Sequence, residues 1–498
     1  MSANTQDKLS AYFPGLVDVC QDQDGQPVYL VSKDNRLSLA ETMSLETGEV
    51  APPPLENLPF TLPRASKVLK YAGREDPTLY QDLLAYLQRF SALDETQWAV
   101  VAHYVFLTYL HDHPDIDYCP YILFYAVPER GKSRTGKSVA YVAFRGVHLI
   151  EMREPNIFRY SQNLRGTLFF DLMDVWKKAE RSGCEDILLL RAEKGAKCAR
   201  ILYPERGAFK DTVYYDIYGP TIIASNEQLH KILETRCLPI VMPNRPGNYE
   251  NPRPQLAQSL KERLTAWRAR TLHGPLSDLS PIDGISGRLW DISRPLFQVG
   301  QLVQPQASGL LLEAINTISG ERNDSKRETA EGRLVAIIKE LTDKQGAADY
   351  LDWTLKTADI WRAFNENRSE DRHVSAQWIG KKLKSMSLRR RTVQGRSEIL
   401  LSSREYQTLL EQYGCISRVP ALPPQTLPEK TMEIQLDVGV VGSCRVSREM
   451  RTLDEFDREL FEEKAALLQF EAGLPREEAE KEAAKWLREV REKSDGSK

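Results

Sequence analysis

Residues 131–138 place glycine, lysine and serine at the spacing G-x-x-x-x-G-K-[ST], a pattern that binds phosphate. They follow an apolar stretch, Tyr121 to Val127, that predicts a buried strand. In such a loop the glycines let backbone N–H groups face the phosphates. Lys137 would reach the β and γ oxygens, and Ser138 would offer its hydroxyl to Mg²⁺. The predicted loop comprises Gly131, Lys132, Ser133, Arg134, Thr135, Gly136, Lys137 and Ser138.

A second candidate for metal chemistry is Asp171, which ends the apolar run Thr167 to Phe170. A strand of this kind presents its carboxylate to Mg²⁺ opposite the serine, as a Walker B aspartate does. Proteins that hydrolyse nucleotides with a Walker B aspartate usually carry a glutamate at the next position. Here the next residue is Leu172, which has no acid–base chemistry. Asp174 is the nearest carboxylate, and is either a substitute base or an acid at the start of a helix.

Two later residues complete the candidate catalytic set. Asn226 closes the apolar run TIIASN and could orient a water between the γ-phosphate and a base. Arg236 precedes the strand-like segment Leu238 to Met242. An arginine supplied by a neighbouring subunit stabilises transition-state charge, whereas the alternative for Arg236 is an ordinary surface salt bridge. The candidate catalytic residues are Lys137, Asp171, Asp174, Asn226 and Arg236.

These elements, in this order, resemble the AAA+ superfamily over about residues 115–245. More narrowly, the phrases PERGKSRTGKS, GTLFFDLMDVWKKAE, EDILLLRAEKGAKCARILYPERGAF and YGPTIIASNE look like the ATPase core of replication or helicase-like proteins of bacterial mobile elements and phages. The resemblance implies ATP and Mg²⁺ as ligands, an oligomer in which ATP bridges subunits, and a hexameric ring as one form of it. It also implies a DNA-binding domain beside the core, and an ATP-driven motor or loader serving a mobile genetic element.

A basic segment lies between Asp171 and Asn226. A loop of this composition could line the pore of a ring and hold nucleic-acid phosphates, or it could be an ordinary solvated face. Its cations are Arg191, Lys194, Lys197, Arg200 and Arg206.

The chain changes character at residues 329–415, where three helices are predicted at 330–341, 357–364 and 375–386, with a strand at 398–401. Helix, helix, helix and a basic hairpin is the order of a winged helix, whose third helix enters the major groove. From Arg372 to Arg396 there are eight Lys or Arg residues and no acid. That segregation favours DNA over the alternative of protein contacts. The predicted DNA contacts are Gln377, Lys381, Lys382, Lys384, Arg389, Arg390, Arg391 and Arg396, with Gln377 and Lys381 favoured for base edges.

Residues 454–498 carry 14 acidic against 9 basic residues and predict two amphipathic helices. A docking tail for a replication partner and a solubilising helix both fit this composition. The whole 498-residue chain has a formal charge of −3, so affinity for nucleic acid must be local. Its seven scattered cysteines favour reduced thiols and a cytoplasmic location.

No membrane segment or secretory signal is expected, because the longest apolar stretch, Trp98 to Leu110, is too short to cross a bilayer and fits a core helix instead. The segment His111 to Asp117 is rich in metal-ligand atoms, but it fits a polar loop better than a metal site.

Together these patterns predict an α/β fold: a three-layer P-loop core of AAA+ type, a small N-terminal α+β module, a C-terminal winged helix and an acidic helical tail. A weakly hydrolysing nucleotide switch that recruits partners to DNA is the alternative to a helicase or loader. The predicted domains are a β-hairpin module at 1–55, a helical lead-in at 56–114, the ATPase core at 115–250, a helical lid at 251–325, the winged helix at 326–416, a linker at 417–453 and the tail at 454–498.

Overall fold

The computed structural model describes residues 8–415, except for 34–35, 47, 208, 228, 246, 346–352, 367, 370–371 and 394–395, together with residue 485. The described residues up to 415 belong to one compact unit, which ends at residue 420. The predicted linker and acidic tail lie outside the described residues, apart from Lys485. The finer domain boundaries stay predictions.

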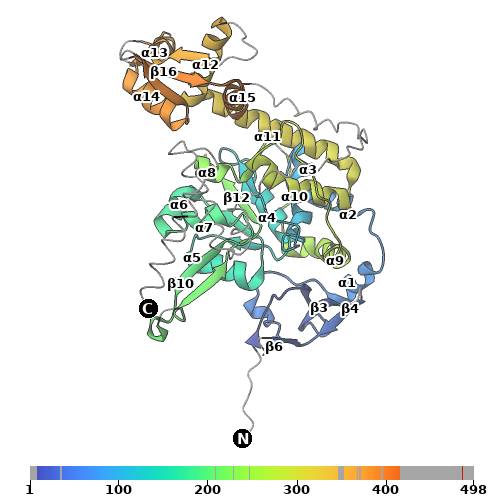
Figure 1. Ribbon diagram of the computed structural model, residues 1–498. Helices are drawn as coiled ribbons and strands as arrows, with labels where there is room; N and C mark the ends of the chain where they lie inside the picture. The colour runs from blue at the N-terminus through green and yellow to red at the C-terminus, as the bar shows by residue number, and fades with distance from the viewer. Residues whose placement is uncertain are drawn as a thin grey trace, which may run out of the picture. The chain divides into compact units, whose positions relative to one another are not determined.

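A parallel sheet of five strands, in the order β13-β7-β12-β9-β8, forms the centre of the first unit (Figure 1). Thr221 of β12 pairs with Tyr121 of β7 on one side and with Leu168 of β9 on the other. A mixed α/β fold that suits a P-loop core is therefore confirmed. The strands are β7 (Tyr121–Tyr125), β8 (Val147–Leu149), β9 (Leu168–Asp171), β12 (Thr221–Ser225) and β13 (Cys237–Val241).

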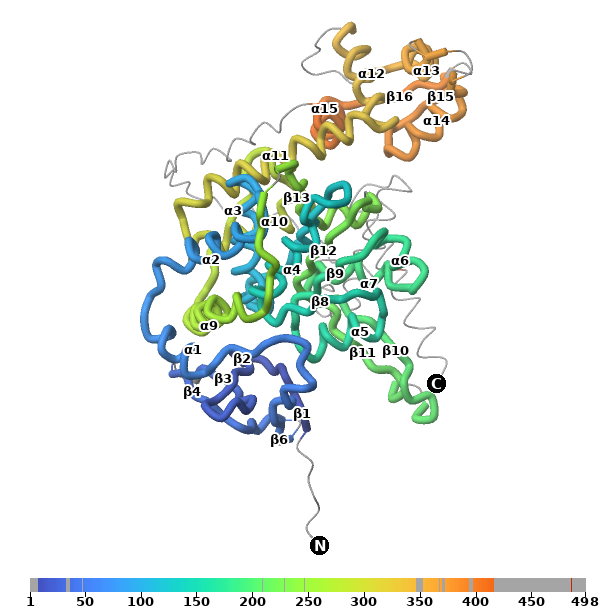
Figure 2. The backbone as a smooth tube through the Cα atoms, turned by 180° about the vertical axis from the view of Figure 1, so that it is seen from behind, coloured from blue at the N-terminus to red at the C-terminus, as the bar shows by residue number. Residues whose placement is uncertain are grey.

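Helices cover both faces of this sheet (Figure 2). Successive strand residues point to opposite faces, so Phe169 joins one hydrophobic core and Phe170 the other. The Phe169 side is covered by α3 (Glu95–Thr108), α4 (Lys132–Val142), α9 (Pro254–Thr271), α10 (Arg288–Val303) and α11 (Ser308–Glu328). The Phe170 side is covered by α5 (Glu154–Arg159), α6 (Val175–Ser182), α7 (Glu185–Leu190) and α8 (Lys231–Glu234).

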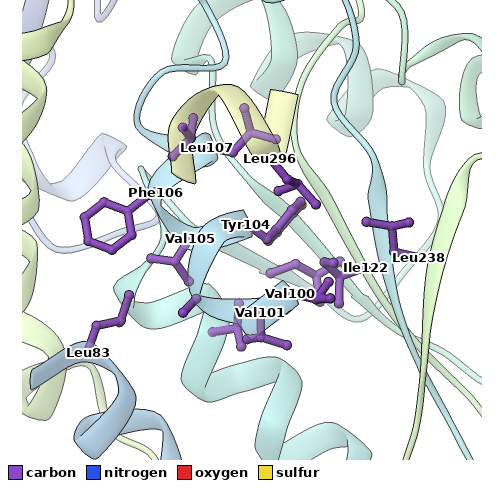
Figure 3. Close-up of a cluster of buried hydrophobic side chains, with 14 of the residues drawn as sticks. Leu83, Val100, Val101, Tyr104, Val105, Phe106, Leu107, Ile122, Leu238 and Leu296 are labelled. Atoms are coloured by element: carbon purple, nitrogen blue, oxygen red, sulfur yellow. The ribbon is translucent and has the colours of Figure 1, made fainter. Parts of the chain in front are cut away.

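Helix α3 is buried on all sides, which explains its long apolar sequence. Asp94 caps its first turn by accepting a hydrogen bond from the Gln97 N–H at 2.8 Å. In Figure 3 Val100 and Tyr104 of α3 lie beside Ile122 of β7. The predicted core helix is confirmed.

A hairpin of β10 (Lys197–Ile201) and β11 (Thr212–Asp216) leaves the core between β9 and β12 (Figure 1). These strands pair with each other, antiparallel, and form a two-stranded sheet of their own. The apolar and β-branched run at 213–217 predicts a further strand of the parallel sheet, and the pairing of β11 with β10 shows that this prediction is wrong. Thr212 to Asp216 are only partly buried or exposed, so they lack the covered faces that a parallel strand requires.

The N-terminal region contains the predicted hairpin, β2 and β3, extended by β4 into an antiparallel sheet. This sheet is tied to the core by a buried ion pair in which Arg145 Nε lies 2.8 Å from Asp18 Oδ1. Arg268 of α9 adds hydrogen bonds to the Val17 and Leu16 carbonyls. The elements here are β1 (Lys8–Leu9), β2 (Leu16–Gln21), β3 (Pro27–Lys33), β4 (Arg36–Ala40), β5 (Met43–Leu45), β6 (Gly48–Ala51), α1 (Ala65–Ala72) and α2 (Leu79–Gln88).

Residues 330–412 build a separate hydrophobic core from helices and a small antiparallel sheet of order β14-β16-β15. The helices fall where the sequence predicts them, and β14 is an additional strand. Leu355, Ile379 and Ile399 are buried together in this core. The elements are α12 (Ala330–Gln345), β14 (Trp353–Lys356), α13 (Thr357–Asn365), α14 (Ala376–Ser385), β15 (Arg389–Val393), β16 (Arg396–Leu401) and α15 (Ser403–Gln412).

Candidate functional site

The turn between β7 and α4 spans residues 126–131. Gly131 caps α4 in the left-handed region with φ of 81°, and Glu129 also has a positive φ of 68°. The first helical hydrogen bond runs from the Thr135 N–H to the Gly131 carbonyl at 2.9 Å. The N–H groups of residues 132–134 therefore remain available at the helix start, which is where anions bind.

This geometry corrects the predicted phosphate-binding loop at 131–138, because residues 132–138 are the first two turns of α4. Gly136 packs against the sheet, and a Cβ there would lie 2.4 Å from Phe169. Ser138 is fully buried and its hydroxyl donates to the Thr135 carbonyl at 2.8 Å. Ser138 is thus a packing residue and cannot serve as the predicted metal ligand.

The lysine and serine that lie at the start of α4 are Lys132 and Ser133, five positions before Lys137 and Ser138. Ser133 Oγ donates to Asp171 Oδ1 at 2.7 Å, which joins α4 to the end of β9. Lys132 is buried and its Nζ donates to the Val127 carbonyl at 3.0 Å, so the lysine folds back over the turn. Burial lowers the pKa of the Lys132 ammonium, and the charge of Asp171 offsets part of that shift.

Gly131, Lys132 and Ser133 themselves match the last three positions of the phosphate-binding pattern. The first position is then Ala126 instead of glycine, which is why the pattern favours the later match. One signal in the sequence could have found the earlier register: Ala126 directly follows the strand, whereas a loop that starts at Gly131 begins several residues after it.

Asp171 is half-buried between Ser133 on one side and His148 of β8 on the other. His148 Nε2 lies 3.7 Å from Asp171 Oδ2. Burial acts to raise the pKa of the Asp171 carboxyl, but His148, the Ser133 hydroxyl and the charge of Lys137 outweigh it and hold that pKa below its usual value. The carboxylate is therefore ionised and suited to a cation.

The position after Asp171 holds no base, and Asp174 is not placed to act as a substitute. Leu172 is buried in the core on the opposite face of the sheet from α4. Asp174 caps α6: it accepts from the Lys177 N–H at 3.2 Å, and its Oδ2 lies 2.6 Å from Lys177 Nζ. The Lys177 hydrogen bonds hold the pKa of Asp174 below its usual value, which weakens it as a base.

Asn226 and Arg236 lie at opposite ends of the parallel strands, Asn226 at the carboxyl ends and Arg236 at the amino ends. Asn226 directly follows β12, which pairs with both β7 and β9, so it shares an edge with the turn and with Asp171. Arg236 directly precedes β13, and its carbonyl accepts from the Tyr121 N–H at the start of β7. A strand of five residues spans about 16 Å, so Arg236 is separated from Lys132 and Ser133 of its own chain by about the length of a strand.

The turn that carries Arg236 is held by Arg322 of α11, which donates to the carbonyls of Glu234 at 3.3 Å and Cys237 at 2.8 Å. Sequence reasoning missed this residue because α11 lies far along the chain. Nothing in its local sequence marks Arg322 as different from a surface arginine.

The predicted basic segment divides into buried and exposed parts. Arg191 is fully buried, donates to Thr221 Oγ1 at 2.9 Å and to several carbonyls, and burial lowers its pKa to about 10. It is a structural residue of the core and cannot line a pore. Arg206 stacks over the Tyr203 ring at 3.7 Å beyond β10. The exposed apolar residues of this hairpin are Ile201, Leu202, Tyr203, Phe209 and Tyr214.

The cations predicted to bind DNA in residues 372–396 also differ from one another. Lys382 pairs with Glu331, and Arg391 pairs with Glu398. Arg390 donates to the Gly380 carbonyl at 3.0 Å, which links β15 to α14, while Arg389 pairs with Glu405. The side chain of Arg396 is outside the described set. Of the predicted DNA contacts on α14, Gln377, Lys381 and Lys384 are exposed.

The segment His111 to Asp117 uses its side chains for internal contacts. His111 Nδ1 bonds to the Thr108 carbonyl, and Asp112 forms an ion pair with Arg268 at 2.6 Å. His113 Nε2 bonds to the Gly274 carbonyl. These contacts favour the polar loop over a metal site.

In the part of the chain that the structure describes, no helix is both long enough and apolar enough to span a bilayer.

No family model matches the chain, and no curated protein matches it. Three solved structures show a distant likeness. The apo C-terminal region of NrS-1 is 11% identical with a TM-score of 0.32, covering 78% of this chain and 96% of that one. The active helicase Cch of SCCmec type IV is 12% identical with a TM-score of 0.30, covering 78% and 80%. An inhibitor-bound JCV helicase is 14% identical with a TM-score of 0.21, covering 50% and 65%.

Proposed function

We propose that the central sheet binds a nucleoside triphosphate, ATP, with Mg²⁺, and that the site is the turn 126–131 with Lys132, Ser133 and Asp171. The observation that carries this proposal is the Ser133–Asp171 hydrogen bond at the start of α4. Lys132 would exchange its bond to the Val127 carbonyl for phosphate oxygens, and the free N–H groups of the helix start would bind the same anion. Ser133 and Asp171 would hold Mg²⁺, which neutralises phosphate charge.

Direct binding of a fluorescent ATP analogue, with and without Mg²⁺, tests this proposal. Wild-type protein should bind the analogue, and Asp171→Asn should lose the part of the affinity that depends on Mg²⁺. The control is Asp174→Asn, which keeps an oxygen able to cap α6 but removes the carboxylate charge that pairs with Lys177. Equal binding by wild type and Asp171→Asn at every Mg²⁺ concentration would contradict the assignment.

We propose that Arg236 acts between subunits of a homo-oligomer, in keeping with an AAA+ arrangement. Its distance from the phosphate-binding residues of its own chain leaves a neighbouring chain as the site it can serve. Arginine fingers contribute about 10³ to 10⁵ in rate. Arg236→Ala mixed with Lys132→Ala should therefore restore turnover that neither variant has alone. No recovery in the mixture would rule out a role across subunits.

We propose that residues 330–412 are a winged-helix domain that binds DNA through α14. Gln377, Lys381 and Lys384 are exposed on that helix, whereas Lys382 is engaged with Glu331. Lys381→Glu with Lys384→Glu should weaken DNA binding and reduce its salt dependence, since each lost phosphate contact reduces the slope against log salt by about 0.9. The matched control is Lys339→Glu with Lys344→Glu on α12. Equal loss in both double variants would remove α14 as the DNA contact.

A nucleotide-dependent switch with slow hydrolysis remains the second candidate, and a specific observation favours it. Leu172 occupies the position of the usual glutamate and is buried away from the site, and Asp174, the nearest carboxylate, is engaged as a helix cap. ATP turnover with and without DNA separates the two functions. A turnover rate that DNA raises supports a motor or loader serving replication of a mobile element, and tight binding without turnover supports the switch.

A further inference from the structure

His148 of the edge strand β8 faces the proposed metal site, although no motif includes it. We propose that His148 is a positioning residue that holds the Asp171 carboxylate in the orientation needed for Mg²⁺. This inference rests on the proposed nucleotide-binding function. It assigns a role to a residue that lies outside the phosphate-binding turn, on a different strand from Asp171.

The position of His148 follows from strand register. His148 pairs with Phe169 of β9, two residues before Asp171, so both side chains lie on the α4 face of the sheet. The imidazole stacks on the Phe169 ring, with centroids 5.0 Å apart and planes at 21°. This stack fixes the ring plane and directs Nε2 toward Asp171 Oδ2 at 3.7 Å.

The two oxygens of Asp171 therefore have different neighbours. Oδ1 accepts the Ser133 hydroxyl at 2.7 Å, and Oδ2 faces His148 Nε2. That Nε2 atom is buried and, among the described residues, forms no hydrogen bond. At 3.7 Å the contact is electrostatic rather than a hydrogen bond. The neutral tautomer with its proton on Nε2 already presents an N–H dipole to Oδ2, so the role needs no change of protonation.

Groups that orient a metal-binding carboxylate strengthen metal binding without touching the metal. Loss of such a partner typically costs about 10- to 100-fold in metal affinity or activity. Here the Ser133 hydroxyl alone would leave the Asp171 carboxylate free to rotate its second oxygen away. With His148 in place, both oxygens are constrained before Mg²⁺ arrives.

The test separates the N–H group of His148 from its packing role. His148→Phe keeps a ring on Phe169 but removes the N–H, whereas His148→Gln removes the ring and retains a donor. His230→Gln is a matched control elsewhere on the chain. The readout is the affinity for a fluorescent ADP analogue with and without Mg²⁺, supported by calorimetric titration of Mg²⁺ into the protein saturated with nucleotide.

We expect His148→Phe to weaken the Mg²⁺-dependent affinity about 10- to 100-fold while leaving the Mg²⁺-free affinity unchanged. His148→Gln, which keeps a donor, should retain most of the wild-type Mg²⁺-dependent affinity. An unchanged Mg²⁺ dependence in His148→Phe, or an equal loss in both variants, would overturn the role of the N–H. Failure of the proposed function looks different, because wild-type protein would then bind no nucleotide, or Lys132→Ala would bind it as wild type does.

Discussion

The tripeptide Gly-Lys-Ser occurs twice on α4, at 131–133 and at 136–138, and the two copies do different things. The first copy starts the helix, with a left-handed glycine and a serine bonded to Asp171. The second lies in the helix interior, with its glycine against Phe169 and its serine fully buried. The two copies differ because of where the helix begins, since only the first turn of a helix has free N–H groups.

Exchange of the two lysines for alanine should give the largest contrast. Hydrogen bonds to charged groups contribute about 1.5–3 kcal/mol, so Lys132→Ala should weaken ATP binding roughly 10- to 150-fold. Lys137 is partly exposed and contributes only its charge to Asp171, so Lys137→Ala should change affinity by less than about fivefold. Equilibrium binding of a fluorescent nucleotide measures both. Equal losses of nucleotide affinity in the two variants would show that Lys137 belongs to the site as much as Lys132 does.

The two glycines should respond in different properties. Gly136→Ala places a Cβ 2.4 Å from the Phe169 ring, and such overpacking costs about 1–3 kcal/mol of unfolding free energy. Gly131 has open space around it but a φ of 81°, so Gly131→Ala strains the turn by about 1–2 kcal/mol and should weaken nucleotide binding. Chemical denaturation and binding assays together measure this. A Gly136→Ala protein of wild-type stability would contradict the packing role.

The serines should differ in Mg²⁺ dependence. Ser133→Ala removes the hydroxyl bonded to Asp171, so binding should become less sensitive to Mg²⁺, with a loss of about 3- to 30-fold at saturating metal. Ser138→Ala removes a bond to the Thr135 carbonyl inside the helix and should leave metal dependence unchanged. Titration of Mg²⁺ at fixed nucleotide distinguishes them.

The smallest expected difference is in pH dependence. The folded-state pKa of Asp171 is below its ordinary value, so the stabilisation from its contact with Ser133 is present above the unfolded-state pKa and is lost as the pH falls through the folded-state pKa. The stability cost of Ser133→Ala should therefore shrink in acid. That of Ser138→Ala should stay constant, because Ser138 Oγ bonds to a carbonyl that does not titrate. Denaturation across acidic pH measures both costs.

Much of the fold follows from sequence patterns, because hydrophobic periodicity is local. The strand at Tyr121, the buried helix α3 and the helices of residues 330–412 form where apolar spacing predicts them. The strand β11 shows the limit. Its β-branched and aromatic residues predict a strand but do not say which strand it pairs with, because pairing depends on contacts that are distant in sequence.

The candidate site shows the same division. Asp171 could be named from the end of an apolar strand, because the carboxyl ends of parallel strands share one edge. Arg191 could not be read as buried, since its hydrogen bonds go to carbonyls scattered over residues 166–220. His148 and Arg322 carry no local pattern, and their roles arise from strand register and from the packing of a distant helix.

By itself the sequence determined that a Gly-Lys-Ser turn follows the strand at Tyr121 and that a carboxylate ends the strand at Leu168. Only the tertiary structure decided which Gly-Lys-Ser copy meets that carboxylate. The physical reason is packing: Gly136 has no side chain, so α4 lies directly against Phe169 and places Ser133, not Ser138, beside Asp171. Two identical tripeptides become a candidate site and a packing contact because the sheet sets the position of the helix.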